Sequence, residues 1–230
     1  MRPAPLVLFD VDGTLFHGPS AELVFAQQLA KSGKIGLRQA LAWVGFNLRY
    51  GPVFGADVLK KNKAYLWHCT EASLAEDAAR LVDRLLAQHA NPLAVAQLNT
   101  HVQRGDQVVL LTGTHSLIAE ALCQRLSCAG YYASVSPHNA RGYRLSPPTS
   151  HPYAARKLVL ARRLWTLGGF LPENTWAYAD SIHDLFLLEQ VGHPVAVNPD
   201  VRLKRIARRR GWPILSNENR PATHPANPSV

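Results

Sequence analysis

Two carboxylates, Asp10 and Asp12, stand directly after a short apolar run near the start of the chain, and a Gly-Thr pair follows them. The run at residues 6–9 has the composition of a buried strand, and residues two apart on an extended chain project to the same side. We therefore expect both acids to project together beyond the strand end. Two acids this close repel each other unless a cation lies between them or one holds a proton. Either outcome suits phosphoryl chemistry, which uses a divalent ion, a carboxylate nucleophile and a nearby acid or base.

A second apolar run, residues 107–112, ends in Thr112 and is followed by Gly113 and Thr114. A hydroxyl at this strand end, beside Asp10, can donate a hydrogen bond to a phosphoryl oxygen. The next backbone amides, at the start of a helix, favour an anion. Thr112 and Gly113 are therefore candidate phosphate-binding residues. An ordinary turn between strand and helix is the alternative, because Thr and Gly are common there.

A lysine near the start of a predicted helix, Lys157, is a candidate for charge neutralisation. Its ammonium group would neutralise both a bound phosphate and a charged aspartate. Arg156 is the adjacent alternative, and a solvated surface position is the other interpretation.

A third strand-like run, residues 175–179, leads into Asp180 and, four residues later, Asp184. One acid at a strand tip and one in the first turn of a helix can both face a metal. Mg²⁺ prefers few carboxylates, together with waters and a phosphate oxygen. Ser181 and Asp184 also have the spacing of a capping box at the start of a helix, so Asp184 has a structural alternative.

These four stretches, in this order, resemble the four motifs of the haloacid-dehalogenase-like superfamily. The resemblance implies that Asp10 is the nucleophile and Asp12 the general acid and base. It also implies that Thr112, Gly113 and Lys157 hold the phosphoryl group. The implied cofactor is Mg²⁺, with the metal ligands Asp10, Asp12, Asp180 and Asp184. The implied activity is phosphatase chemistry through an aspartyl-phosphate.

The long segment between the first two motifs, and the stretches at residues 189–200 and 211–213, resemble the phosphoserine-phosphatase-like branch, subfamily IB. In that branch the segment is a bundle of helices that caps the substrate. His183 is a departure, since close relatives usually carry Asn at this position. In that branch the Asn helps to position phosphate or water. The presence of His183 therefore leaves the class of substrate open.

Strand-like and helix-like patterns alternate along the chain, which predicts an α/β fold: a three-layer, Rossmann-like parallel sheet core. An all-helical cap is expected after the first strand. The predicted boundaries are 1–16 and 91–215 for the core, 17–90 for the cap and 216–230 for a disordered tail. Further strands are predicted at 131–135, 194–197 and 213–215, and helices at 20–31, 36–49, 55–67, 73–88, 91–103, 115–127, 153–167, 182–190 and 199–210.

The bulk composition narrows the class of protein. No apolar run in the 230 residues approaches the roughly 20 that a membrane span needs. The chain enters its first strand at once, which leaves no room for a signal peptide, and three scattered cysteines indicate reduced thiols. We therefore expect a cytoplasmic protein. The formal charge of +9 includes a basic segment at 202–210, which is either a solvated helix face or a contact for an anionic partner.

One predicted helical segment, residues 37–50, is apolar and aromatic, with cations only near its ends. It either packs as a buried helix inside the cap or lies at a membrane interface and covers an apolar substrate. The expected substrate is therefore a bulky or amphiphilic phosphomonoester, with weak contact to the anionic inner face of a membrane. The alternatives are a small-metabolite phosphatase of phosphoserine type, a phosphotransferase, and a non-catalytic protein that binds phosphate or an anionic surface. Nucleic acid is not an expected partner.

Overall fold

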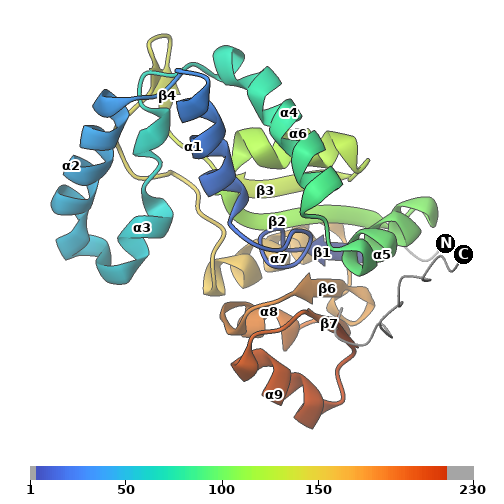
Figure 1. The fold of residues 1–230 in the computed structure, drawn as a ribbon. Coiled ribbons are helices and arrows are strands. Elements are labelled where there is room, and N and C mark those ends of the chain that lie inside the picture. Colours follow the sequence, from blue (N-terminus) through green and yellow to red (C-terminus); the bar gives the residue numbers. More distant parts are fainter. Residues whose placement is uncertain (1–3, 217–230) are drawn as a thin grey trace, which may run out of the picture.

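The computed structural model describes residues 4–216, and its centre is a six-stranded parallel sheet (Figure 1). The strands lie in the order β3-β2-β1-β6-β7-β8, so the strand that leads to Asp10 is central. Parallel neighbours place all their carboxyl ends at one edge, where ligands bind in open sheets of this kind. The bounds are Leu6–Phe9 for β1, Gln107–His115 for β2, Gly130–Ser134 for β3, Trp176–Ala179 for β6, His193–Val197 for β7 and Ile214–Leu215 for β8.

Helices cover both faces of the sheet, as the apolar runs of its strands require. In β1, Val7 and Phe9 face one core with the helices α5 (Pro92–Gln103) and α6 (Ser116–Arg125). Leu6 and Leu8 face the other core, which includes α7 (Ala155–Gly168), α8 (Leu185–Leu188) and α9 (Val201–Arg210). The predicted three-layer α/β fold is confirmed.

A helical insertion follows β1 and extends from the sheet to one side of the molecule (Figure 1). It contains α1 (Ala21–Lys31), α2 (Leu37–Phe54), α3 (Val58–Lys61) and α4 (Glu71–Gln88). The side chains of α1 and α4 join the core cluster that also contains α6. By contrast, α2 and α3 form a separate small cluster around Phe46 and Val58.

A hairpin from the core pairs with the insertion through the main chain. The hairpin consists of β4 (His138–Asn139) and β5 (Gly142–Tyr143). The amide of His68 donates to the carbonyl of Tyr143 at 3.1 Å, and the amide of Tyr143 donates to the carbonyl of Cys69 at 2.9 Å. Gly142 has φ +107°, and a Cβ there would lie 2.5 Å from the Cys69 carbonyl oxygen. The close approach of insertion and hairpin therefore requires glycine.

The helix predicted at 55–67 is wrong, because this segment is broken into the short pieces η1 (Gly55–Asp57), α3 and η2 (Ala64–Leu66). Gly55, with φ +55°, ends α2. Asn62 then turns the chain: its Oδ1 accepts from the Ala64 amide at 3.0 Å, and its Nδ2 donates to the Trp43 carbonyl at 2.9 Å. An Asn side chain that bonds to nearby main chain competes with helix in this way.

Two predicted helix starts also need correction. The helix expected from Ser73 begins at Glu71, because Thr70 is the N-cap and its Oγ1 accepts from the Ser73 amide at 3.3 Å. The helix expected at 182–190 is a 3₁₀ turn, η4 (Ile182–Asp184), followed by α8. The predicted tail lies outside the described residues, apart from residue 216. Among residues 4–216, no helix combines the length and the apolar character that crossing a bilayer requires.

A buried polar contact fastens α5 to the strand beside β1. The Phe9 and Tyr178 rings stack with their centroids 4.1 Å apart. On the same face, His101 is buried, with Nε2 2.8 Å from the Tyr178 hydroxyl and Nδ1 2.7 Å from Asp106. Both ring nitrogens of this histidine are therefore satisfied without water.

We expect Tyr178→Phe to lower the free energy of unfolding by about 1–3 kcal/mol, because it leaves a buried ring nitrogen of His101 without a partner. Urea unfolding followed by circular dichroism measures this. Tyr131→Phe, which removes a hydroxyl from a half-buried tyrosine of β3, is the matched control and should change stability by much less. Equal effects of the two substitutions would contradict the assigned contact.

Candidate active site

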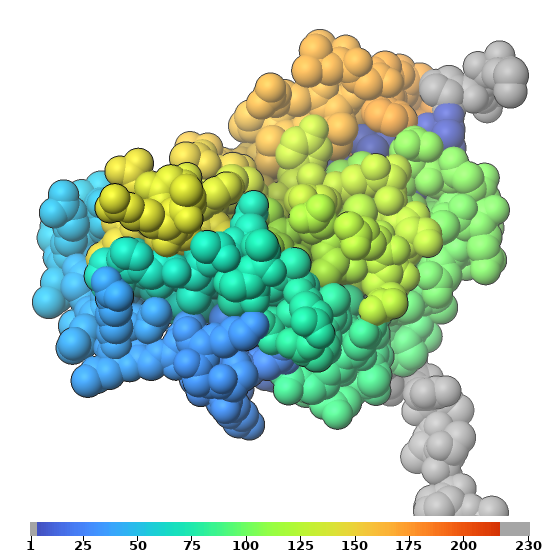
Figure 2. Space-filling view, turned by 90° about the horizontal axis from the view of Figure 1, so that it is seen from above, coloured from blue at the N-terminus to red at the C-terminus, as the bar shows by residue number. Residues whose placement is uncertain are grey.

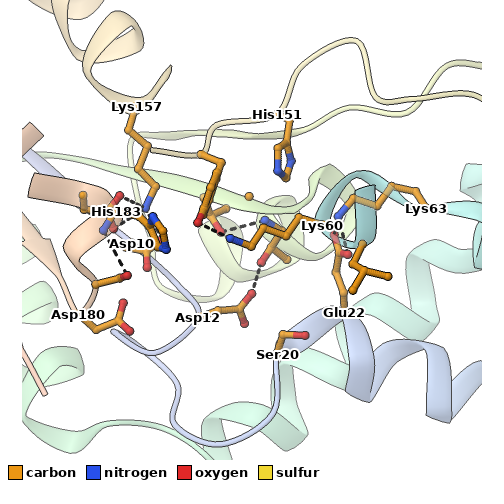
Figure 3. A pocket seen from close by; sticks show the side chains of 17 residues that line it. Asp10, Asp12, Ser20, Glu22, Lys60, Lys63, His151, Lys157, Asp180 and His183 are labelled. Atoms are coloured by element: carbon orange, nitrogen blue, oxygen red, sulfur yellow. Dashed lines mark hydrogen bonds and ion pairs between the residues drawn. The ribbon is translucent and has the colours of Figure 1, made fainter. Parts of the chain in front are cut away.

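A cavity of about 380 Å³ lies at the carboxyl edge of the sheet, between the core and the insertion (Figure 3). The core lines it with residues that follow β1 and β6, with the last residues of β2 and with the first turn of α7. The insertion contributes residues of α1 and of the α3 region. Every predicted site residue lines this cavity: Asp10, Asp12, Thr112, Gly113, Lys157, Asp180 and Asp184.

Lys157 lies buried between two carboxylates. Its Nζ is 2.7 Å from Asp10 Oδ1 and 2.9 Å from the carboxylate of Asp184. Burial alone would lower the pKa of Lys157, but Asp10 and Asp184 outweigh it and hold that pKa above its usual range. The ammonium group is therefore charged at neutral pH. Arg156, the alternative in the sequence, is exposed and does not line this cavity.

Three carboxylates meet beside this ammonium group. Oxygen atoms of Asp10, Asp180 and Asp184 all lie within 4.8 Å of one another. The Thr14 hydroxyl is 3.2 Å from Asp180 Oδ1 and holds that side chain in place. The turn after Asp12 requires glycine at position 13. Gly13 has φ +88°, and a Cβ at this position would collide with the Asp180 carboxylate.

This group of carboxylates has the composition of a divalent cation site. When all three are ionised, one ammonium group leaves two negative charges uncompensated. Burial and the neighbouring acids raise the pKa of Asp180, and burial, opposed by Lys157, raises that of Asp184. A cation between them would relieve this repulsion, and an all-oxygen donor set suits Mg²⁺. Asp10, Asp180 and Asp184 therefore fit the implied metal.

The Asp12 carboxylate, which the resemblance also names as a metal ligand, does not belong to this group of three and is hydrogen-bonded elsewhere. Its Oδ1 accepts from the Ala21 amide at 2.7 Å and its Oδ2 accepts from the Thr114 hydroxyl at 2.6 Å. These bonds turn the carboxylate toward α1 and β2. Burial, the largest influence, raises the pKa of Asp12, so this carboxyl group is suited to carrying a proton.

Thr112 and Gly113 lie where the sequence places them, at the end of β2, and both line the cavity. The Thr112 hydroxyl accepts from the Thr114 amide at 3.0 Å. Thr114, which the sequence interpretation did not select, contacts Asp12 directly. Ser181 is the N-cap of η4, as predicted, but Asp184 pairs with Lys157 rather than completing a capping box.

The insertion supplies charged residues that sequence reasoning missed. Glu22 of α1 and Lys63 form a largely buried ion pair on the cavity wall, with Nζ–Oε distances of 2.5 and 2.6 Å. Lys60 reaches across to Tyr153 of the core, contacts its hydroxyl, and lies 3.7 Å from its ring centre. The available signals were Glu22, the one charged residue in the stretch 21–30, and the cluster of lysines at positions 60, 61 and 63.

A chain of hydrogen bonds sets the tautomer of His151, another lining residue that was missed. The Ser134 hydroxyl lies 2.5 Å from the Gly113 carbonyl oxygen, so its single hydrogen is used there. His151 Nδ1, 2.6 Å from the same hydroxyl oxygen, must then be the donor. Burial and nearby lysines lower the pKa of His151 to about 4, and its Nε2 is a buried acceptor without a partner.

His183, the departure noted in the sequence, lines the cavity on the side of the carboxylate group (Figure 3). Its ring lies 5.1 Å from that of Tyr153, and its side chain is exposed. The position is therefore at the rim of the site, where it faces whatever enters the cavity.

Residues 7–189 match the model of a family described as haloacid dehalogenase-like hydrolase. The chain belongs to this family. The match confirms the predicted family and the prediction of an enzyme of the hydrolase class. The matched range contains all four of the motifs whose residues line the cavity.

Relatives of this haloacid dehalogenase-like hydrolase include proteins named as phosphatases. A histidinol-phosphatase of Neisseria meningitidis is 27% identical over 92% of this chain and 98% of its own. Phosphoserine phosphatase SerB1 of Mycobacterium tuberculosis is 29% identical over 90% of this chain and 68% of its own. A protein of unknown function from Bordetella pertussis has the same fold, with a TM-score of 0.75, 22% identity and coverage of 91% and 97%. The predicted resemblance to the phosphoserine-phosphatase-like branch is confirmed.

We expect the free energy of unfolding of the metal-free protein to fall as pH rises from about 5 to about 8. Raised pKa values of Asp180 and Asp184 mean that the native state binds more protons than the unfolded state in this range, so rising pH favours unfolding. Mg²⁺ should stabilise the protein most at the upper end. Thermal unfolding in chelator, with and without added Mg²⁺, measures both effects.

Asp180→Asn should make the pH dependence shallower and remove most of the Mg²⁺ stabilisation. Asp83→Asn, at an exposed position of α4, is the matched control and should leave both unchanged. A wild-type protein whose unfolding temperature does not respond to Mg²⁺ would contradict the assignment of the cation site.

Proposed function

We propose that the protein is a Mg²⁺-dependent phosphomonoester hydrolase that works through an aspartyl-phosphate on Asp10. The observation that supports this is the separation of two acids that are neighbours in sequence. Asp10 belongs to the group of carboxylates beside Lys157, where an anion and a cation can both be held. Asp12 is fixed separately by Thr114 and the Ala21 amide. One acid is thus placed to attack and the other to transfer a proton.

In the proposed reaction, Asp10 attacks phosphorus and the bond from phosphorus to the substrate oxygen breaks. Asp12 donates its proton to the departing oxygen. Asp12 then takes a proton from water, which attacks the aspartyl-phosphate, releases phosphate and regenerates the Asp10 carboxylate. Mg²⁺, when held by Asp10, Asp180 and Asp184, would neutralise charge on the phosphoryl oxygens.

The remaining residues bind rather than react. Lys157 neutralises charge as phosphorus passes through its transition state, and the Thr112 hydroxyl and Gly113 amide can donate to phosphoryl oxygens. The helical insertion, with predicted boundaries 17–90, acts as a cap, since Glu22, Lys60 and Lys63 lie across the cavity from the core residues (Figure 3).

The cavity is large enough for a leaving group much bigger than phosphate, which supports the proposal of a bulky phosphomonoester. Leu59, an exposed apolar residue of α3, lines it on the side of the insertion, where the apolar part of an amphiphilic substrate can lie. The wall nearer the reacting groups is polar, so the part of the leaving group next to phosphate must be polar as well.

A small-metabolite phosphatase is the second candidate, and the buried pair of Glu22 and Lys63 supports it. A leaving group that carries an amine would find a carboxylate there, and the unpaired Nε2 of His151 accepts from any N–H or O–H donor. The relatives named for phosphoserine and histidinol phosphate make those two esters the natural test substrates. A non-catalytic phosphate-binding protein is disfavoured, because binding alone does not need a separately held Asp12.

We expect Asp10→Asn to reduce phosphate release by about 1,000-fold or more, since it removes the nucleophile and a metal ligand while keeping the shape of the side chain. Asp12→Asn should lower turnover by about 100-fold or more through loss of the acid and base. Steady-state phosphate release with Mg²⁺ measures both. Asp83→Asn is the control and should match wild type; activity of Asp10→Asn within about tenfold of wild type would refute the mechanism.

Substrate choice can be measured as ratios of kcat/KM among phosphoserine, histidinol phosphate and a lysophosphatidate. The proposal of a bulky, amphiphilic substrate expects lysophosphatidate to exceed the other two by about tenfold or more. Glu22→Gln should then leave the ratio nearly unchanged. If the second candidate is right, an amine-bearing ester leads, and Glu22→Gln lowers its kcat/KM selectively by about tenfold or more. Glu76→Gln, on the exposed side of α4, is the matched control.

A further inference from the structure

Helix α2 is apolar on the face that it turns to solvent. Leu37, Leu41, Val44 and Leu48 follow one another at steps of four, three and four, which places them in one stripe along the helix. Their exposed fractions are 76%, 63%, 49% and 77%. The opposite face already packs inward through Ala42 and Phe46. A helix that is apolar on both faces is ordinarily covered on both.

The charges around α2 are all of one sign along the sequence. No Asp or Glu occurs from residue 23 to residue 56, while four cations do: Lys31, Lys34, Arg38 and Arg49. Lys34 is engaged with Asp77 of α4. The guanidinium groups of Arg38 and Arg49 lie over the rings of Trp67 and Tyr50, at 4.7 and 5.6 Å from the ring centroids. These two arginines border the packed face of α2, and both are exposed.

The stripe lies at the outer edge of the molecule, where a large flat surface such as a bilayer can contact it. In Figure 1, α2 is at the far edge of the insertion, away from the sheet, and in Figure 2 it forms one end of the molecule. The neighbouring helix α3 carries Leu59, which is exposed and lines the cavity. The apolar stripe and the rim of the cavity therefore belong to adjacent helices of the same small cluster.

We propose that the outer face of α2 docks on an anionic lipid bilayer, with the four aliphatic side chains at the boundary between head groups and acyl chains. Arg38 and Arg49 would meet acidic head groups at the edge of the inserted stripe. A second copy of this chain is the weaker fit. A twofold interface through α2 would bring the same cations of both copies together, and two chains of charge +9 repel each other. This docking does not depend on which phosphomonoester is hydrolysed.

Co-sedimentation of the full chain with vesicles tests the proposal. Wild type should pellet with vesicles of phosphatidylcholine and phosphatidylglycerol, bind pure phosphatidylcholine vesicles less, and release as salt rises from about 0.1 to about 1 M. Leu37→Gln with Leu48→Gln should weaken binding by about tenfold or more at unchanged net charge. Leu167→Gln with Val201→Gln, at positions 79% and 77% exposed on α7 and α9, is the matched control and should bind like wild type.

The result can overturn the proposal in three ways. Wild type that does not pellet with anionic vesicles refutes it. Binding by the Leu37/Leu48 variant equal to wild type would assign vesicle contact to another surface, such as the basic α9. A lipid-free dimer in sedimentation velocity that the same variant abolishes would assign the stripe to an interface between copies. Circular dichroism of each variant checks that the fold is kept.

Discussion

The ammonium group of Lys157, buried between Asp10 and Asp184, is the contact on which the arrangement of the site depends. Three carboxylates come within 4.8 Å of one another at the end of a central strand, and such a group is unstable without positive charge nearby. One lysine offsets part of the repulsion and leaves room for a divalent cation. Asp10 directly follows β1, Asp184 ends η4 and Lys157 lies in the first turn of α7, so this contact joins three separate parts of the core.

The two acids after β1 show how local environment separates similar side chains. Asp10 and Asp12 have the same chemistry and are two residues apart, yet one faces the carboxylate group and the other faces Thr114 and the first amide of α1. The turn at Gly13 allows this, because no other residue fits beside Asp180. Burial then favours the protonated form of Asp12, which suits the role of proton donor that we propose for it, beside the nucleophile role that we propose for Asp10.

The insertion completes the site from the opposite side. It is tied to the core by main-chain pairing with the hairpin near Tyr143 and by the contact of Lys60 with Tyr153. These ties hold Glu22 and Lys63 across the cavity from Asp10 and Lys157. The same segment presents its apolar stripe outward on α2, so the part of the chain that lines the cavity also carries the surface for which we propose a partner.

Sequence alone determined the α/β class, the long helical insertion and the set of core residues around the cavity. It could do so because strand ends in a parallel sheet meet at one edge, which converts positions such as Asp10, Thr112 and Asp180 into neighbours. Sequence analysis missed the interruption at Asn62 of the helix predicted at 55–67. The Asn62 side chain accepts from the nearby Ala64 amide, and such a bond leaves the pattern of apolar residues unchanged. Sequence analysis also left Lys157 and Arg156 as alternatives, which only the packing of α7 against the sheet distinguishes.

Tertiary structure also decided that Asp12 turns away from the other carboxylates, that Glu22 pairs with Lys63, and that the stripe of α2 faces outward. Each of these depends on which surfaces come together in three dimensions, and hydrophobic periodicity does not specify that.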